Sequence, residues 1–173
     1  MGQYFKLINL DKKEYVSPYD IDGVGKLWEW MANINECGVI TLLLSERWAG
    51  DRVALVGDYD ESKLYDIAST EYKNVSKDAG NLYKNYKQNK QTIYAVNKSA
   101  NEYISGSFKQ VSMCLVMLLR KSSEGGGGDI NEDYETAGIW AGDRIVVQEE
   151  SPQKKCKDIN SQVYKDTFSF YKS

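Results

Sequence analysis

Two clusters of acidic residues contain the side chains in this chain that are best suited to chemistry. The first follows an apolar run and the second lies beside four successive glycines: Asp58, Asp60 and Glu61, then Glu132, Asp133 and Glu135. Carboxylates bind Ca²⁺ or Mg²⁺ and act as general acids and bases, so a carboxylate-dependent hydrolase built on Asp58 and Asp60 is one hypothesis. Neither cluster has the spacing and closing Glu of an EF-hand, and a solvated acidic turn has the same composition. The sequence therefore predicts no metal site.

Other kinds of catalysis are disfavoured by what the chain lacks. It has no histidine, which removes His-based triads and dyads and imidazole metal sites. The glycine run 125–128 lacks the Lys-Ser/Thr pair of a phosphate-binding loop. Cys37, Cys114 and Cys156 are too few and too scattered for a disulfide framework or a metal knuckle, which indicates reduced thiols. We therefore expect no cofactor and no catalytic residues.

The pentapeptide Trp-Ala-Gly-Asp-Arg occurs twice, at residues 48–52 and again 92 positions later at 140–144. One hypothesis is a structural corner, in which glycine has positive φ, Asp caps the turn, Trp is buried, and Arg pairs with a carboxylate or covers the indole. The alternative is a small-ligand or carbohydrate site, which requires solvent-accessible indoles. The candidate residues for either role are Trp48, Asp51, Arg52, Trp140, Asp143 and Arg144. Repeated motifs usually reproduce the joints of a fold, which favours the corner.

The elements that would position these residues begin with two similar β-hairpins. β-prone runs around a short polar link predict one hairpin at 4–17 and another at 92–105, and four residues coincide between them at an offset of 88. Apolar residues at helical spacing over 24–32 predict a short amphipathic helix with Trp28 facing inward. The second half has room for only a shorter or reshaped helix.

The segments between the hairpins and the pentapeptides are apolar. Length and β-branching favour buried strands for 39–44 and 114–119, although Leu and Met leave helices open. The four glycines after the second run indicate a flexible loop insertion. Residues 76–91 predict a helix that links the halves, with Leu82, Tyr83 and Tyr86 on one side.

A third block, 66–73, matches 158–165 at the offset of 92, with five identities in eight positions. Three matched blocks in the same order favour an internal duplication. The predicted fold class is α+β, a duplicated ββαββ-like unit whose halves, 1–88 and 89–173, close around a shared core as one compact domain.

The chain also resembles a family of uncharacterised small proteins. The resemblance lies in the opening segment 1–15, in 47–53 and in 56–59, since that family starts with the same hairpin and carries a Trp-Ala-Gly-Asp-Arg-Ile/Val block ending in Gly-Asp-Tyr. It covers about the first 75 residues and extends to the second half only through its degenerate copy, where Gln-Glu-Glu at 148–150 replaces Val-Gly-Asp. The resemblance implies no mechanism and no catalytic residues.

Composition narrows the classes of partner. A net charge of −3 is mild and disfavours nucleic acid, and the longest apolar runs are too short to span a bilayer. No signal peptide is evident, so we expect a cytoplasmic protein. Its 13 tyrosines and the aromatic tail 168–171 favour an interaction surface. The resulting hypothesis is a non-enzymatic protein-binding or structural component of an intracellular complex, with a protein partner or a second copy of the chain.

Overall fold

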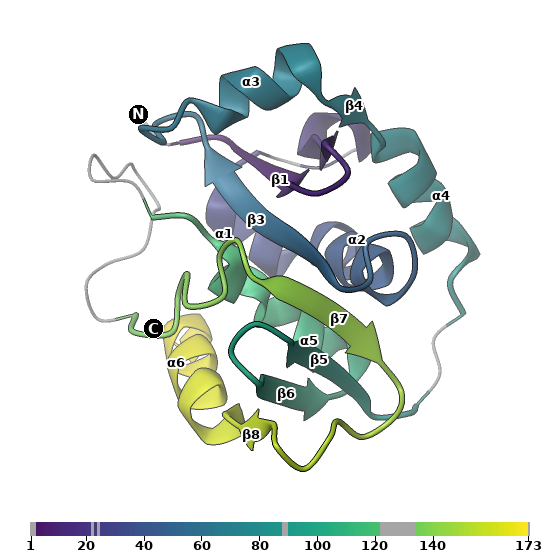
Figure 1. Ribbon diagram of the computed structural model, residues 1–173, viewed down its shortest axis with the longest axis vertical. Coiled ribbons are helices and arrows are strands. Elements are labelled where there is room, and N and C mark those ends of the chain that lie inside the picture. Colours follow the sequence, from purple (N-terminus) through teal and green to yellow (C-terminus); the bar gives the residue numbers. More distant parts are fainter. Residues whose placement is uncertain (1–2, 22, 24, 88–89, 122–133, 173) are drawn as a thin grey trace.

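The computed structural model describes every residue except 1–2, 22, 24, 88–89, 122–133 and 173 (Figure 1). The strands are β1 Phe5–Asn9, β2 Glu14–Val16, β3 Asp51–Gly57, β4 Lys73–Asn74, β5 Ile93–Asn97, β6 Glu102–Gly106, β7 Arg144–Gln148 and β8 Lys157–Asp158. The α-helices are α1 Leu27–Ala32, α2 Ile34–Ser45, α3 Leu64–Glu71, α4 Ser76–Asn85, α5 Phe108–Met113 and α6 Asn160–Lys172. The described residues also form two 3-10 helices, η1 Pro18–Ile21 and η2 Leu115–Leu118.

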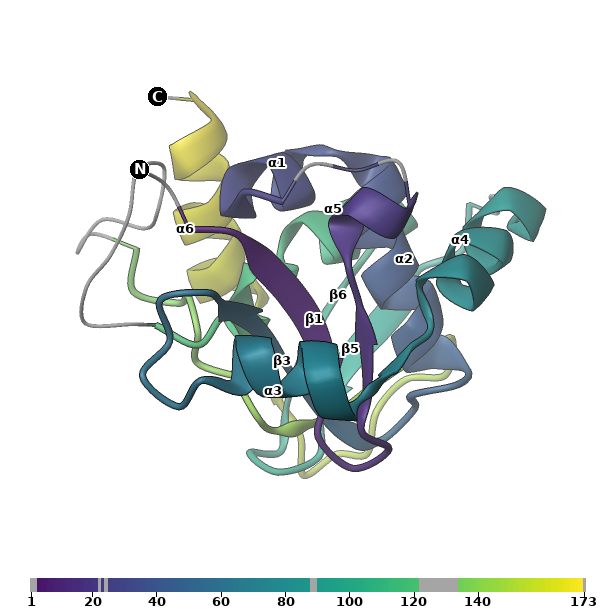
Figure 2. The ribbon, with the colours of Figure 1, turned by 90° about the horizontal axis from the view of Figure 1, so that it is seen from above.

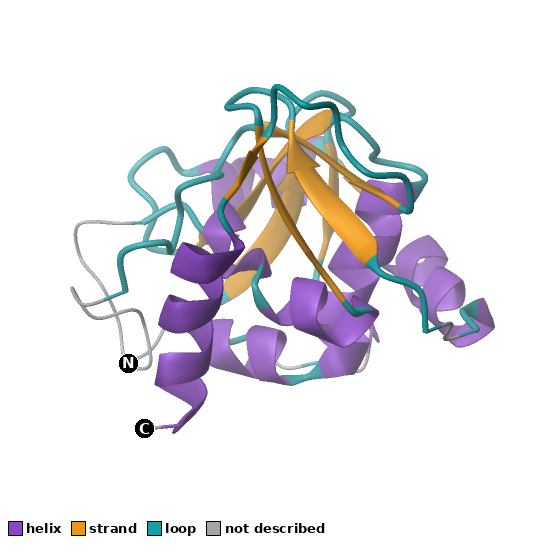
Figure 3. Cartoon of the chain, turned by 90° about the horizontal axis from the view of Figure 1, so that it is seen from below, coloured by secondary structure: helices purple, strands orange, loops and turns teal. Residues whose placement is uncertain are grey.

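The strands form one mixed sheet in the order β4-β2-β1-β3-β7-β5-β6-β8. Helices α1, α2 and α5 pack against one face, and α3 lies on the opposite face (Figure 2). Seen from below, most of the helices gather beneath the strands (Figure 3). A single buried cluster joins residues of both halves, so the core is shared. The α+β class is confirmed, and the boundary between 88 and 89 lies outside the described residues.

The two halves of the sheet have the same strand order, reversed about the contact between β3 and β7. At that contact Arg52 lies opposite Arg144, the same position of the two pentapeptides. The amides of Gly50 and Gly142 donate to carbonyls of the opposite strand at 2.8 and 2.9 Å. Both glycines have positive φ, 80° and 79°, as the corner hypothesis requires. The two pentapeptides thus occupy equivalent places, while descent from one duplicated segment stays a prediction.

Both predicted hairpins are present, and their turns are built alike. β1 pairs antiparallel with β2, and β5 with β6. The side-chain oxygen of Asn9 accepts hydrogen bonds from two backbone N–H groups of its turn at 3.0 and 2.8 Å. The oxygen of Asn97 accepts the equivalent pair at 2.8 and 2.9 Å. Local side-chain hydrogen bonds therefore fix the same turn in each half.

The preference for strands at 39–44 and 114–119 was wrong. The first run lies inside α2, which begins after Asn33, whose side chain caps the helix. The second run begins at Cys114, the C-cap of α5, and forms the helix η2, and within it only Leu119 makes a β-bridge, to Leu55. Because both segments are buried on almost every side, they lack the polar face that marks an amphipathic helix. A short apolar run of this kind has no period that separates strand from helix.

The predicted helix at 24–32 is present as α1, although the side chains of Val24 and Trp28 lie outside the described residues. Leu27, Trp30 and Met31 are fully buried large side chains of this segment. In the second half α5 has the same six-residue length, and the equivalent bonds from the corner tryptophans to Leu43 and Met117 make it correspond to the start of α2, so no described helix there corresponds to α1. The predicted linker helix is α4, and Leu82 packs on the core as expected, together with Tyr83 and Tyr86.

The match of 66–73 with 158–165 has the wrong register. β4 pairs parallel with β2, and β8 pairs parallel with β6 in the equivalent place, so Lys73–Asn74 corresponds to Lys157–Asp158. Helix α3, which contains most of the block, covers the outer face of β1 and β3 and has no counterpart after β7 among the described elements. The side chains of the aromatic tail 168–171 lie outside the described residues.

Candidate functional site

The two repeated tryptophans are structural anchors inside the corners. Trp48 and Trp140 are both 0% exposed, so neither indole offers a face for stacking on a sugar or base. Trp48 Nε1 donates to Glu14 Oε2 at 2.8 Å, and Trp140 Nε1 donates to Glu102 Oε2 at 3.1 Å. Arg47 adds an ion pair to the first glutamate at 2.8 Å. The accessibility that the carbohydrate hypothesis needed is therefore absent from both corners.

The electrostatics of the first corner depend on Glu14. Burial alone would raise the pKa of this carboxyl, but hydrogen bonds from Arg47 and Trp48 outweigh burial and lower its pKa below the ordinary value. At neutral pH the carboxylate is charged and accepts from both donors. Its role is to satisfy a buried indole N–H, which would otherwise lack an acceptor.

The pentapeptide aspartates have a different partner from the one the sequence suggested. Instead of capping the turn through backbone N–H groups, Asp51 accepts a hydrogen bond from Asn9 Nδ2 at 2.9 Å. Asp143 accepts the equivalent bond from Asn97 Nδ2 at 2.8 Å. Each asparagine thus connects its hairpin turn to a pentapeptide corner, which makes the Asp a joint between segments far apart in the sequence.

The pentapeptide arginines meet at the centre of the sheet. Arg52 Nε donates to Asp11 Oδ1 at 2.8 Å, and Arg144 Nη1 donates to Asp11 Oδ2 at 2.9 Å. The backbone hydrogen bond from Arg52, followed by its side chain and by Arg144, lowers the pKa of Asp11. This carboxylate bridges two like charges on opposing strands, which agrees with the expected pairing of Arg with a carboxylate. The corner residues are brought together, and their polar groups are used in holding the halves.

The acidic cluster after β3 is also engaged in structure. Asp60, 1% exposed, pairs with Arg120 Nε at 3.0 Å and accepts from the backbone N–H of Ser62 at 2.9 Å. Burial would raise the pKa of Asp60, but Ser62 and Arg120 lower it. Asp58 accepts from the backbone N–H of Tyr4 at 3.0 Å. Of the second cluster, Glu135 is exposed, while Glu132 and Asp133 lie outside the described residues. Within the described ranges no group of three His, Cys, Asp or Glu side chains could hold a metal ion.

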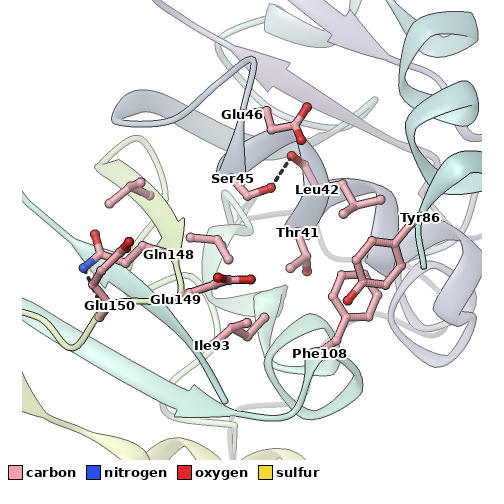
Figure 4. A pocket seen from close by; sticks show the side chains of 12 residues that line it. Thr41, Leu42, Ser45, Glu46, Tyr86, Ile93, Phe108, Gln148, Glu149 and Glu150 are labelled. Carbon is pink, nitrogen blue, oxygen red and sulfur yellow. Dashed lines mark hydrogen bonds between the residues drawn. The ribbon is translucent and has the colours of Figure 1, made fainter. Parts of the chain in front are cut away.

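The feature that sequence reasoning missed is an open cleft of about 420 Å³ between the end of α2 and the end of β7 (Figure 4). Tyr86 and Phe108 stack at one side of it, with ring centroids 4.5 Å apart. Twelve residues line it, and none is basic: Thr41, Leu42, Ser45, Glu46, Tyr86, Ile93, Phe108, Val146, Val147, Gln148, Glu149 and Glu150. The lining combines an apolar floor with an acidic rim.

The rim of this cleft faces solvent. Ser45, Glu46, Glu149 and Glu150 are exposed, so the site is an open groove instead of an enclosed pocket. Three carboxylates without a basic neighbour in the lining favour a cationic group in the ligand. The one signal in the sequence was the replacement of Val-Gly-Asp by Gln-Glu-Glu after the second pentapeptide. That signal gave no site, because the other walls come from α2, from α5 and from the segment between α4 and β5.

Comparisons with models of known protein families, with curated proteins and with solved structures find no match for this chain. Among the described residues, no helix combines the length and the apolar character that crossing a bilayer requires.

Proposed function

We propose that this protein is a non-enzymatic binding component that holds a protein partner in the cleft between α2 and β7, as part of a cytoplasmic complex. The observation that carries the proposal is the acidic, open groove with an apolar floor. Small-molecule sites bury most of their ligand, whereas this groove has exposed residues along its rim. A polypeptide that places an apolar side chain on the floor and a basic one at the rim satisfies both features.

The polar residues outside the cleft also favour the cleft as the binding site, because they already bond within the protein. The carboxylates of the hydrolase hypothesis, Asp58 and Asp60, already accept hydrogen bonds from the protein's own backbone and from Arg120. The corner residues are likewise occupied in joining the two halves. The cleft carboxylates differ, because their charges face solvent beside an apolar surface.

Site-specific crosslinking tests this proposal. A photoreactive phenylalanine analogue is placed at Ser45 in the cleft and, as a matched control, at Lys77 on α4, and each variant is irradiated in extract from the native source. We expect a discrete protein adduct from position 45 that is lost when Glu149 and Glu150 are replaced by Lys. Equal adducts from both positions, or none from position 45, would contradict the proposal.

A further inference from the structure

Strand β7 has an edge that faces the cleft. The backbone N–H of Lys98 donates to the carbonyl of Arg144 at 2.8 Å, so Arg144 directs its backbone groups toward β5. Backbone direction alternates along a strand, so Val146 and Gln148 also face β5, while Val147 faces away from it. No described residue makes a hydrogen bond to the outward N–H or C=O of Val147. Val147 also lines the cleft, which leaves this edge available for pairing.

The first half of the molecule shows what occupies the equivalent edge. Leu55 of β3 corresponds to Val147, since each lies opposite the middle residue of the first strand of its hairpin. At Leu55 the chain supplies its own partner, because Leu119 makes a parallel bridge with it and the backbone N–H of Arg120 donates to its carbonyl at 2.8 Å. An extended apolar-basic dipeptide therefore fills on one side the place that is open on the other.

The chain cannot fill the second edge in the same way with the equivalent segment. The carbonyls of Leu43 and Met117 each accept from the backbone N–H of a corner tryptophan at 2.8 Å, which aligns residues 45–46 with 119–120. Residues 45–46 form the end of α2 and its C-cap, and they do not extend toward β7. The cleft is the space left between this helix end and the strand.

Acidic side chains lie close to both edges. The side chain of Arg120 pairs with Asp60, an acid that follows β3, at 3.0 Å. Glu149 and Glu150 also follow their strand, although they lie two or three positions before Pro152, the residue equivalent to Asp60, and Glu46 stands on the opposite rim. A backbone hydrogen bond and one ion pair thus hold residues 119–120 against β3. The cleft beside β7 has the corresponding backbone edge and carboxylates, but no segment in its lining pairs with them.

Resting on the proposed binding function, we infer that the edge of β7 takes an extended segment of a partner protein, parallel to β7, in which an apolar residue is followed by Arg or Lys. The N–H of the basic residue donates to the carbonyl of Val147, as Arg120 does to Leu55. Its side chain reaches Glu149 and Glu150, and the apolar residue covers the floor near Phe108. This is strand addition to a sheet edge, in which main-chain bonds give affinity and side chains give specificity.

The probe is the peptide acetyl-Leu-Leu-Arg-Lys-amide, which copies residues 118–121, titrated into the full chain labelled with ¹⁵N. We expect shifts of the amide signals confined to Val147 and its neighbours in the cleft. A peptide N-methylated at the arginine amide lacks the donor and should bind about fivefold more weakly, the change expected for one lost hydrogen bond. The double variant E149Q/E150Q should weaken binding about fivefold at low salt and less at high salt, while the matched variant E71Q/E135Q should not.

Four results would overturn the inference. If the N-methylated peptide binds as tightly as the parent, no strand forms, although binding in the cleft remains. If lysine amide alone shifts the same signals with equal affinity, the site takes small cations. If protection of Val147 rises with protein concentration and the chain sediments as a dimer, the occupant is a second copy. If no peptide shifts the cleft signals, the edge does not pair, and the crosslinking from position 45 decides the proposed function separately.

Discussion

The buried pair of Trp48 and Glu14 gives a quantitative test of how the corners are stabilised. Glu14 accepts a bidentate pair from Arg47, at 2.8 and 3.0 Å, and the indole N–H at 2.8 Å. Glu102 accepts the indole N–H of Trp140 at 3.1 Å, and Ile139 stands in place of the arginine in that half. The replacement of each glutamate by glutamine keeps an oxygen for the indole and removes the charge. The two substitutions therefore separate the ion pair from the indole hydrogen bond.

The expected loss of stability follows from how exposed the two charged side chains are. The side chains of Arg47 and Glu14 are 33% and 11% exposed, so their pair is partly screened and should contribute about 1 kcal/mol. We expect Glu14→Gln to lower the free energy of unfolding by about 1 kcal/mol, and Glu102→Gln by less than about 0.5 kcal/mol. Urea denaturation at pH 7, with unchanged dependence on denaturant, measures both values. Equal losses, or a larger loss at Glu102, would refute this account of the corner.

The same pair predicts a pH dependence. The pKa of Glu14 is lower in the folded chain than in the unfolded chain, where a glutamate titrates near about 4.3. The folded state then binds fewer protons, so the contribution is complete above the unfolded pKa and is lost as pH falls through the folded pKa. The difference in stability between wild type and Glu14→Gln should therefore shrink between about pH 5 and pH 3. A difference that stays constant over that range would show that the charge of Glu14 contributes nothing.

Three further outcomes are expected. Burial raises the pKa of Cys37 and of Cys114 to about 12, so a thiol reagent at pH 8 should modify Cys156 alone in the native protein and all three cysteines after denaturation; fast modification of more than one native thiol would contradict this. Gly142 has φ of 79°, so Gly142→Ala should destabilise the fold by about 1 kcal/mol in urea denaturation, whereas an unchanged midpoint would show that the corner tolerates a side chain. Because both indoles are fully buried, Trp48→Phe and Trp140→Phe should leave the acrylamide-quenchable fluorescence intensity unchanged while the total intensity falls, and a drop in the quenchable intensity would show an exposed indole.

Much of the architecture could be predicted because it depends on local patterns. The hairpins are marked by alternating β-prone residues and by Asn9 and Asn97, whose side chains close the turns. The pentapeptides mark the joint between the halves, since each needs a positive-φ glycine and a buried tryptophan. Each of these structural requirements is met by the same residue type in both halves, so the sequence alone reveals them.

Other features depend on tertiary environment and could not be predicted from one sequence. The run within α2 is apolar because the helix is enclosed by the sheet, α1, α4 and α5, so its composition reports burial and not secondary structure. The register of 158–165 depends on whether α3 is counted as an insertion, which only the pairing of β4 and β8 decides. The cleft is lined by side chains from segments far apart in the sequence, and no regular spacing relates them. Its carboxylates belong to no recognisable sequence motif.

Hydrogen exchange at the amide of Val147 decides whether the edge of β7 is open in the free protein and pairs with a bound peptide. Val146, one residue earlier, faces β5 and serves as the internal control, since its amide should be protected in every state. In the free protein the Val147 amide should exchange much faster than that of Val146, and it should become protected when acetyl-Leu-Leu-Arg-Lys-amide is added. A Val147 amide that is already as protected as Val146 in the free protein, or that stays unprotected at saturating peptide, would contradict an open strand edge that binds a partner.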